Sequence, residues 1–99
     1  MKVNEEKQRE LLAKVKYEDK AIKWKDTIDG MGLPMLTTTY KGKTYDVCIN
    51  YDNGIAIVYK FNKYGMGECK NMPYDMVIKY IKGKITVINP IELHMQTKM

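Results

Sequence analysis

Residues 43–61, KTYDVCINYDNGIAIVYKF, contain two runs of alternating apolar residues around an Asp-Asn-Gly cluster. Alternation with a period of two is typical of a β-strand with one buried face. Asn53-Gly54 favours a type I′ turn, because both residues readily adopt the positive φ angles that this turn requires. The stretch therefore predicts a β-hairpin whose lysines face solvent. The expected apolar faces are Tyr45, Val47, Ile49 and Tyr51 on the first strand and Ile55, Ile57, Tyr59 and Phe61 on the second.

The residues on either side of this hairpin predict further elements. Upstream, Met35–Tyr40 is rich in threonine and predicts a strand that turns at Lys41-Gly42. Downstream, residues 62–67 form a turn cluster that is followed by a short polar run, 68–71. The chain therefore returns at least twice within one sheet.

The period then changes to that of a helix. Tyr74, Val77, Ile78 and Ile81 follow a helical spacing, and Pro73 and Gly83 suit the two ends of a helix over about 73–82. Lys84–Ile88 predicts a last strand, which Pro90 ends, and residues 94–99 are expected to be a tail.

The N-terminal part predicts a helix over 5–16. Asn4 can cap it, Glu5 and Glu6 suit its positive end, and Leu11, Leu12 and Val15 form its apolar stripe. Residues 20–28 fit either a helix with a rotated face or an edge strand. The glycines and proline of 29–34 break the chain, but the segment is too short and apolar to predict a domain boundary.

These elements predict one α+β domain over residues 1–99. Its helical N-terminal segment covers 1–29 and its β-rich core covers 35–90, including the short second helix. We expect a small antiparallel sheet of four or five strands. Strand and turn spacing is similar to that of SH3-like barrels, so the sheet is expected either to stay open or to bend into such a barrel, and no diagnostic residue decides between the two.

Composition limits the class of partner. The chain carries a formal charge of +5, and Arg9 is its single arginine. Lysine is a mobile point charge, whereas base recognition favours the rigid fork of arginine. A nucleic-acid partner would therefore be contacted through its backbone. The frequent Lys, Ile, Asn, Tyr and Met are typical of an AT-rich coding genome, such as that of a low-GC bacterium or of its phage or plasmid, so a phage or mobile-element origin is one expectation.

Residues 1–10 are polar and charged and contain no apolar export signal, and no apolar run approaches the ~20 residues of a membrane helix. We therefore expect a cytoplasmic protein without membrane contact. In that compartment Cys48 and Cys69 are expected to be free thiols.

No pattern predicts an enzyme. His94 is the single histidine and lies in the expected tail, while Cys48 and Cys69 have no catalytic partner nearby in the sequence. Four zinc ligands and a calcium-loop pattern are both missing from the sequence. We expect no catalytic residue, no metal and no cofactor.

The positive signal is lysine interleaved with tyrosine around the hairpins. Single-stranded nucleic acid is bound by this combination, because charge follows the phosphates while aromatic rings stack on bases. The first hypothesis is thus a binding module for nucleic acid or nucleoprotein. Its expected contact residues are Lys41, Lys43, Lys60, Lys63, Tyr64 and Lys70.

A second hypothesis is a protein–protein inhibitor or adaptor that blocks a host protein, for example one of a defence system. The apolar stripe of the first helix would then form a partner face or the seam of a homodimer, together with adaptable apolar residues near the Gly-Pro break. An undefined small-molecule-binding domain is the third hypothesis. The alternative partner face comprises Leu11, Leu12, Val15, Met31 and Leu33.

Overall fold

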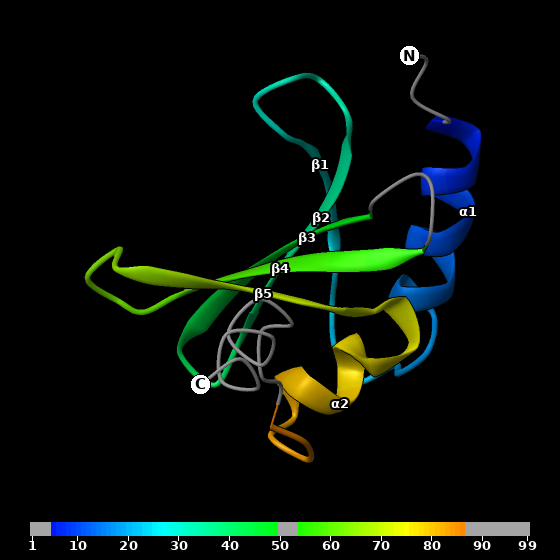
Figure 1. Cartoon of the computed structure of the whole chain (residues 1–99). Coiled ribbons are helices and arrows are strands. Elements are labelled where there is room, and N and C mark those ends of the chain that lie inside the picture. Colours follow the sequence, from blue (N-terminus) through cyan, green and yellow to red (C-terminus); the bar gives the residue numbers. More distant parts are fainter. Residues whose placement is uncertain (1–4, 50–53, 87–99) are drawn as a thin grey trace, which may run out of the picture.

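The computed structural model describes residues 5–49 and 54–86 (Figure 1). It confirms the α+β class, with an N-terminal helix, a five-stranded antiparallel sheet and a short second helix. None of the described helices is long and apolar enough to span a membrane. The elements are α1 (Glu5–Lys16), β1 (Lys25–Ile28), β2 (Pro34–Tyr40), β3 (Lys43–Ile49), β4 (Ile55–Phe61), β5 (Gly67–Pro73), a 3-10 turn (Tyr74–Met76) and α2 (Val77–Ile81).

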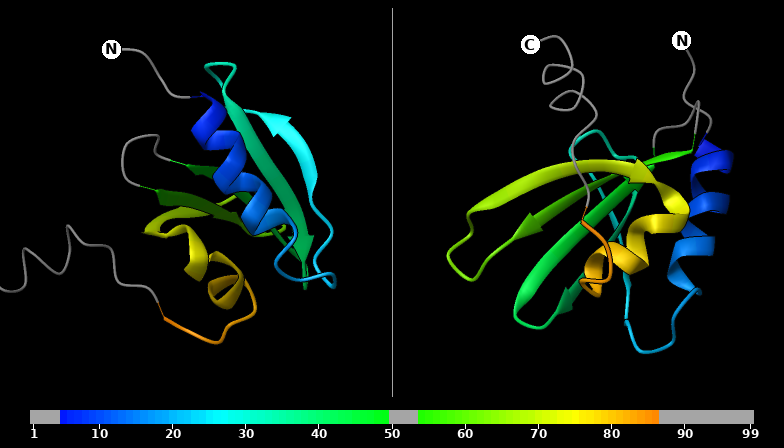
Figure 2. Two further views of the ribbon diagram at one scale, coloured as in Figure 1. Left: turned by 90° about the vertical axis from the view of Figure 1, so that its right-hand side faces the viewer. Right: turned by 60° about the horizontal axis from the view of Figure 1, so that its bottom comes forward.

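The strands form a meander in the order β1-β2-β3-β4-β5, and each strand pairs antiparallel with the next. Within the described residues β1 and β5 are the two edges and do not pair with each other, so the SH3-like barrel option is wrong. Both helices lie on the same side of the sheet (Figure 2). We call the face toward the helices the inner face and the opposite one the outer face.

The hydrophobic core lies between the inner face and the two helices. The apolar stripe of α1 packs onto β2 and β3. Tyr80 of α2 contacts β3, β4 and β5 through Tyr45, Lys60 and Glu68. Burial of this apolar surface is the main driving force for folding. The core residues are Leu11, Leu12, Val15, Ile22, Leu36, Tyr45, Val47, Ile49, Ala56, Val58, Met72, Val77, Ile78 and Ile81.

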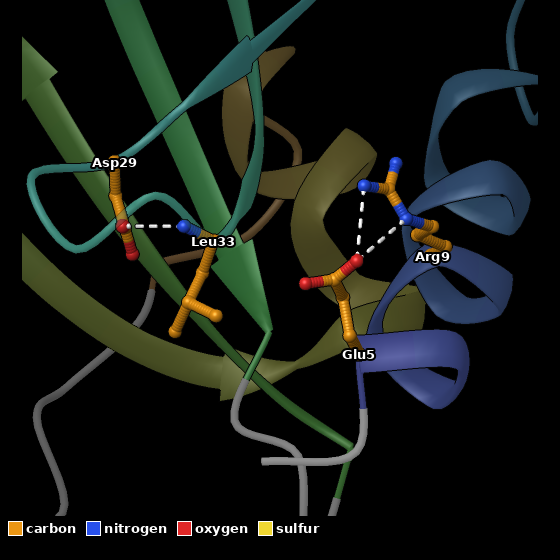
Figure 3. A network of polar contacts seen from close by, with 4 residues as sticks. All are labelled: Glu5, Arg9, Asp29 and Leu33. Carbon is orange, nitrogen blue, oxygen red and sulfur yellow. Dashed lines mark hydrogen bonds and ion pairs between the residues drawn. The ribbon is translucent and has the colours of Figure 1, made fainter.

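Helix α1 has the bounds that the sequence predicts. Glu5 and Glu6 occupy the first turn and basic residues the last, as the helix dipole favours. Arg9 and Glu5 form an exposed ion pair of 3.2 Å, one turn apart (Figure 3), which contributes a few tenths of a kcal/mol at most. The Gln8 side chain donates a 2.9 Å hydrogen bond to the Ile49 carbonyl and so ties the helix to β3. Asn4, the predicted cap, lies outside the described residues.

The ambiguous segment 20–28 contains an edge strand. Asp19 first forms a turn, accepting a 2.8 Å hydrogen bond from the Ala21 backbone N–H, and β1 then pairs with β2. The Lys82 ammonium donates to Asp19 at 2.6 Å and joins the end of α2 to this turn. The predicted break at 29–34 is the β1–β2 connection. The Asp29 carboxylate holds it, accepting the N–H group of Met31 and that of Leu33 (Figure 3).

One prediction about the central hairpin is wrong. The odd-numbered face of β3 is buried as expected, but the buried residues of β4 are Ala56 and Val58. Each pair between β3 and β4 joins an odd-numbered residue to an even-numbered one, as in Val47 with Val58. Paired residues lie on the same face, so an odd-numbered inner face on β3 requires an even-numbered inner face on β4. The larger residues Ile55, Ile57, Tyr59 and Phe61 therefore lie on the outer face, and Lys60 lies on the inner face.

The pairing also bears on the Asn53-Gly54 turn. A two-residue turn there would pair Ile49 with Val58 if pairing were uninterrupted, whereas Ile49 pairs with Ala56. A shift of two residues changes the register but keeps every side chain on its face, which is why alternation cannot detect it. Residues 50–53 lie outside the described residues, and the turn type stays a prediction.

The C-terminal half contains two further differences. The polar run 68–71 belongs to β5, an edge strand with one fully buried side chain, Met72, so it shows no apolar alternation. Lys84–Thr86 form a bend where a strand is predicted, because the chain has just left the C-cap of α2 at Lys82 and Gly83. Val87, Ile88, Pro90, His94 and the expected tail lie outside the described residues.

Replacing Gly67 with alanine should destabilise the fold. A Cβ at Gly67 would lie 2.6 Å from the Phe61 ring and 2.8 Å from the Lys60 carbonyl oxygen, so Gly67→Ala should lower the free energy of unfolding by about 1–3 kcal/mol. Gly30→Ala is the matched control, because nothing lies within 4 Å of its added Cβ. Urea denaturation of both variants measures the difference, and equal midpoints would contradict the predicted clash.

Candidate functional site

Two hairpin tips lie at the same end of the sheet. The β2–β3 turn at Lys41-Gly42 has positive φ at both residues, 51° and 80°, as a type I′ turn requires. Thr44, just after this turn, pairs with Phe61, just before the β4–β5 turn. The two tips are therefore neighbours, and both lie at the opposite end of β4 from the 3-10 turn, which follows the Pro73 end of β5.

Three lysines lie on the inner face near these tips. Lys43 begins β3, Lys60 pairs with the buried Tyr45, and Lys70 pairs with the buried Val58. Each of them shares its face with core residues because side chains alternate along a strand. The inner face thus continues from the apolar core into a cluster of three ammonium groups.

The lysines line two adjoining cavities of about 300 Å³ and 360 Å³. Lys60 and Glu68 line both cavities, so the two form one open depression, which we call the lysine groove. The first cavity is lined by Lys43, Lys60, Asn62, Met66, Gly67 and Glu68, and the second by Lys60, Glu68, Lys70, Tyr80, Gly83, Ile85 and Thr86.

The groove holds more positive than negative charge. Burial lowers the pKa of Lys60, and the positive charges of Lys43 and, to a smaller extent, Lys70 lower it further, against the opposing effect of Glu68. Glu68 pairs with Lys60 across the strands, yet none of the ion pairs among the described residues involves a lysine of the groove. The Lys60 ammonium instead lies 5.7 Å from the centre of the Tyr80 ring. Three ammonium groups therefore face one carboxylate.

Tyrosines around the groove have two different roles. Tyr45 is buried and packs edge-on against Tyr80, with ring centres 6.4 Å apart. Burial, followed by the charge of Glu68, raises the pKa of Tyr80 to about 12, and its hydroxyl donates to Glu68 at 3.5 Å. These two rings support the groove from below and are not free to stack on a ligand.

Tyr64 is an exposed aromatic residue in a turn that side-chain hydrogen bonds stabilise. Its side chain is 76% exposed, and the Lys63 ammonium lies 5.1 Å from the ring centre. Asn62 fixes this β4–β5 turn, because its side-chain oxygen accepts the N–H groups of Tyr64 at 2.9 Å and Met66 at 3.1 Å. The turn therefore presents an ammonium and an open ring face together beside the groove.

The predicted nucleic-acid contacts come together in the fold. Lys43, Lys60 and Lys70 line the groove, while Lys63, Tyr64 and Lys41 occupy the adjacent tips, with Lys41 placed 5.5 Å from the Tyr40 ring. Sequence reasoning missed Glu68, Asn62 and Tyr80. The Asn-x-x-Gly spacing of the β4–β5 turn was an available signal for Asn62.

The alternative partner face is not available as predicted. Leu11, Leu12 and Val15 are buried in the core of their own chain, because α1 packs its whole apolar stripe onto the sheet. Met31 is 79% exposed and Leu33 is half-buried, both in the β1–β2 connection. The first helix therefore offers no apolar surface to a partner.

The two cysteines are free thiols, as predicted. Both lie on the outer face, in strands separated by β4 and hence about 10 Å apart, beyond the ~7 Å limit between the Cα atoms of a disulfide. Burial, then the negative charges of Asp29 and Asp46, raises the pKa of Cys48 to about 11. Among the described residues no three His, Cys, Asp or Glu side chains gather as metal ligands would.

Alkylation should distinguish the two thiols. Iodoacetamide at pH 8 should modify the exposed Cys69 first and Cys48 at least about tenfold more slowly, because only the thiolate reacts and a raised pKa reduces its fraction. Peptide mass spectrometry at successive times measures both rates, with Cys69→Ser as the control that isolates Cys48. Equal rates in the folded protein would contradict the burial of Cys48.

Comparison of the chain with protein-family models, with curated proteins and with solved structures gives no match. The geometry and charge of the lysine groove are therefore the basis on which a function is proposed.

Proposed function

We propose that this protein is a non-enzymatic binding module for single-stranded nucleic acid, which it holds mainly through the phosphates. One observation carries the proposal: Lys43, Lys60 and Lys70 share a groove whose lining holds one carboxylate, Glu68, and none of the three lysines forms an ion pair among the described residues. The net charge of +5 adds a long-range attraction to any polyanion. Nucleic acid is the most abundant polyanion of the cytoplasm, where we propose that the protein acts.

Phosphate is the anion that suits these lysines. Mutual repulsion and burial disfavour the charge on Lys60, and a phosphate between Lys43 and Lys60 would relieve the repulsion. Lysine ammonium groups bind phosphate as point charges, with no preference for a particular base. The expected mode of binding is therefore sensitive to salt and tolerant of sequence.

The β4–β5 turn favours single-stranded over double-stranded nucleic acid as the partner. Tyr64 presents an exposed ring beside Lys63, and such a ring can stack on an unpaired base while the lysines follow the backbone. In duplex DNA the faces of the bases are covered by their neighbours. The ring would therefore contribute only when the bases are unstacked.

Reversing the charge of Lys43 should weaken binding strongly. In Lys43→Glu the new carboxylate lies beside the Lys60 ammonium and neutralises it, so two positive charges leave the groove. Affinity for a fluorescent single-stranded oligonucleotide should fall at least about tenfold at low salt, and the slope of log K against log salt should become shallower by about 1.4, or about 0.7 for each charge removed. Fluorescence anisotropy over a salt series measures both quantities.

Lys20→Glu is the control for this change. It alters the net charge equally, but Lys20 is exposed in the α1–β1 connection, outside the groove. Its affinity should fall less than about threefold at the same salt concentration. Equal losses in the two variants would show that only net charge matters and would remove the groove as the site.

Removing the Tyr64 ring should reduce binding of single strands selectively. Tyr64→Ala should cost about 1–3 kcal/mol with a single-stranded oligonucleotide, the range for one stacked base, and much less with a duplex. Tyr17→Ala is the matched control, because Tyr17 is 74% exposed and also lies beside a lysine, Lys16, at 5.6 Å. If both variants bind like the wild type, stacking by Tyr64 is wrong.

A further inference from the structure

Strand β4 carries its larger apolar residues on the face that no helix covers. Its inner face holds Ala56 and Val58, whereas Ile57, Tyr59 and Phe61 lie on the outer face. Among the described residues both helices pack on the inner side (Figure 2). An antiparallel sheet with one wet face normally shows polar residues there, so this strand has the composition of one that is covered on both sides.

Neighbouring strands extend this apolar surface. Cys48 of β3 pairs with Ile57, and Met35 of β2 lies beside Cys48, all on the outer face. The β1–β2 connection borders this surface on one side. Between the connection and the outer face lies an open cavity of about 360 Å³, lined by Ile28, Asp29, Gly30, Met35, Asp46, Cys48, Tyr59 and Phe61. We call Met35, Cys48, Ile57, Tyr59 and Phe61 the outer-face patch.

We propose that the outer-face patch is the contact surface between two copies of this chain. A surface that binds a copy of itself must carry few like charges, since each charge meets an identical patch across the two-fold axis. The lysine groove fails this condition. The outer face meets it, because its strand positions hold one central carboxylate, Asp46, and one lysine, Lys25, at the β1 edge.

Polar side chains beside the patch, on β1, β2 and β3, already have hydrogen-bond partners. Thr37 donates a 2.7 Å hydrogen bond to the Asp46 carboxylate. The single hydroxyl hydrogen of Thr27 is donated either to the Met35 carbonyl at 3.2 Å or to the Thr37 hydroxyl oxygen at 3.0 Å. Burying a polar group costs little when its hydrogen bonds are made beforehand. This row can therefore be covered by a second sheet without leaving those hydroxyls unpaired.

The available area suits a weak but specific dimer. The patch lies on the middle strands of an outer face whose five strands, about 4.8 Å apart and up to about seven residues long, present roughly 500 Å² per copy. Two such faces bury roughly 1,000 Å² in total, near the lower limit for specific interfaces. Packing of the outer faces leaves the inner faces, and with them both lysine grooves, open to solvent. The dimer itself does not depend on the proposed binding of nucleic acid.

Sedimentation equilibrium of the full chain tests the proposal. In reducing buffer, the average mass should rise from one chain toward two as the concentration increases from about 1 to about 200 µM. Ile57→Asp places a charge in the centre of the patch opposite its own copy, and it should weaken the dimer at least about tenfold. Tyr17→Asp, an equal change at an exposed tyrosine outside the patch, should leave the mass curve unchanged.

Tyr59→Asp keeps the test valid if Ile57→Asp fails to fold, because Tyr59 is 38% exposed and tolerates a polar substitution better. Circular dichroism establishes that each variant is folded. An average mass equal to that of one chain at every concentration would overturn the proposal. The patch would then be covered by another part of the chain or by a different partner. A dimer that persists in folded Tyr59→Asp would overturn it as well.

Discussion

The pairing of Val47 with Val58 determines the face on which every other strand residue lies. Neither side chain has any exposed surface, and each packs beneath the helices on the inner face. Because side chains alternate along a strand, this pair also places Tyr45 and Lys60 inside and Ile57 outside. A slip by one residue would bring Cys48 and Asp46 into the core and is therefore strongly disfavoured, whereas a slip by two keeps the faces unchanged.

The same alternation explains how the core and the lysine groove share one face of the sheet. The helices cover only part of the inner face. Within that part the inner positions are mostly apolar, such as Leu36 and Met72, and the buried Thr38 donates its hydroxyl to the Lys23 carbonyl. Toward the hairpin tips the inner positions are Lys43 and Lys60 instead. The groove requires no special element of its own, since it is the uncovered end of the face that builds the core.

Short-range sequence patterns made part of the fold predictable. Helix α1 has both a charge pattern and an apolar stripe, and the turn at Lys41-Gly42 needs only two residues, so both were predicted from sequence. The lysines around the two turns lie close together because the turns are adjacent in the sheet, while their contact with a partner stays a prediction. The buried face of β4 was not predictable from hydrophobicity, since the larger residues lie outside. Strand β5 was missed because an edge strand with one buried residue has no periodic signal.

Lys60 is the residue whose position is hardest to explain by folding alone. A lysine whose pKa is lowered in the folded state is less favourable as a cation there than in the unfolded chain. At neutral pH it is charged in both states, so this position costs stability, and the cost diminishes only as the pH rises into the alkaline range. An apolar residue on the same inner row would extend the core beside Tyr45 and Tyr80 instead. Residues that oppose stability in this way concentrate at functional sites, and an anion bound between Lys43 and Lys60 would turn the unfavourable charge into a favourable one.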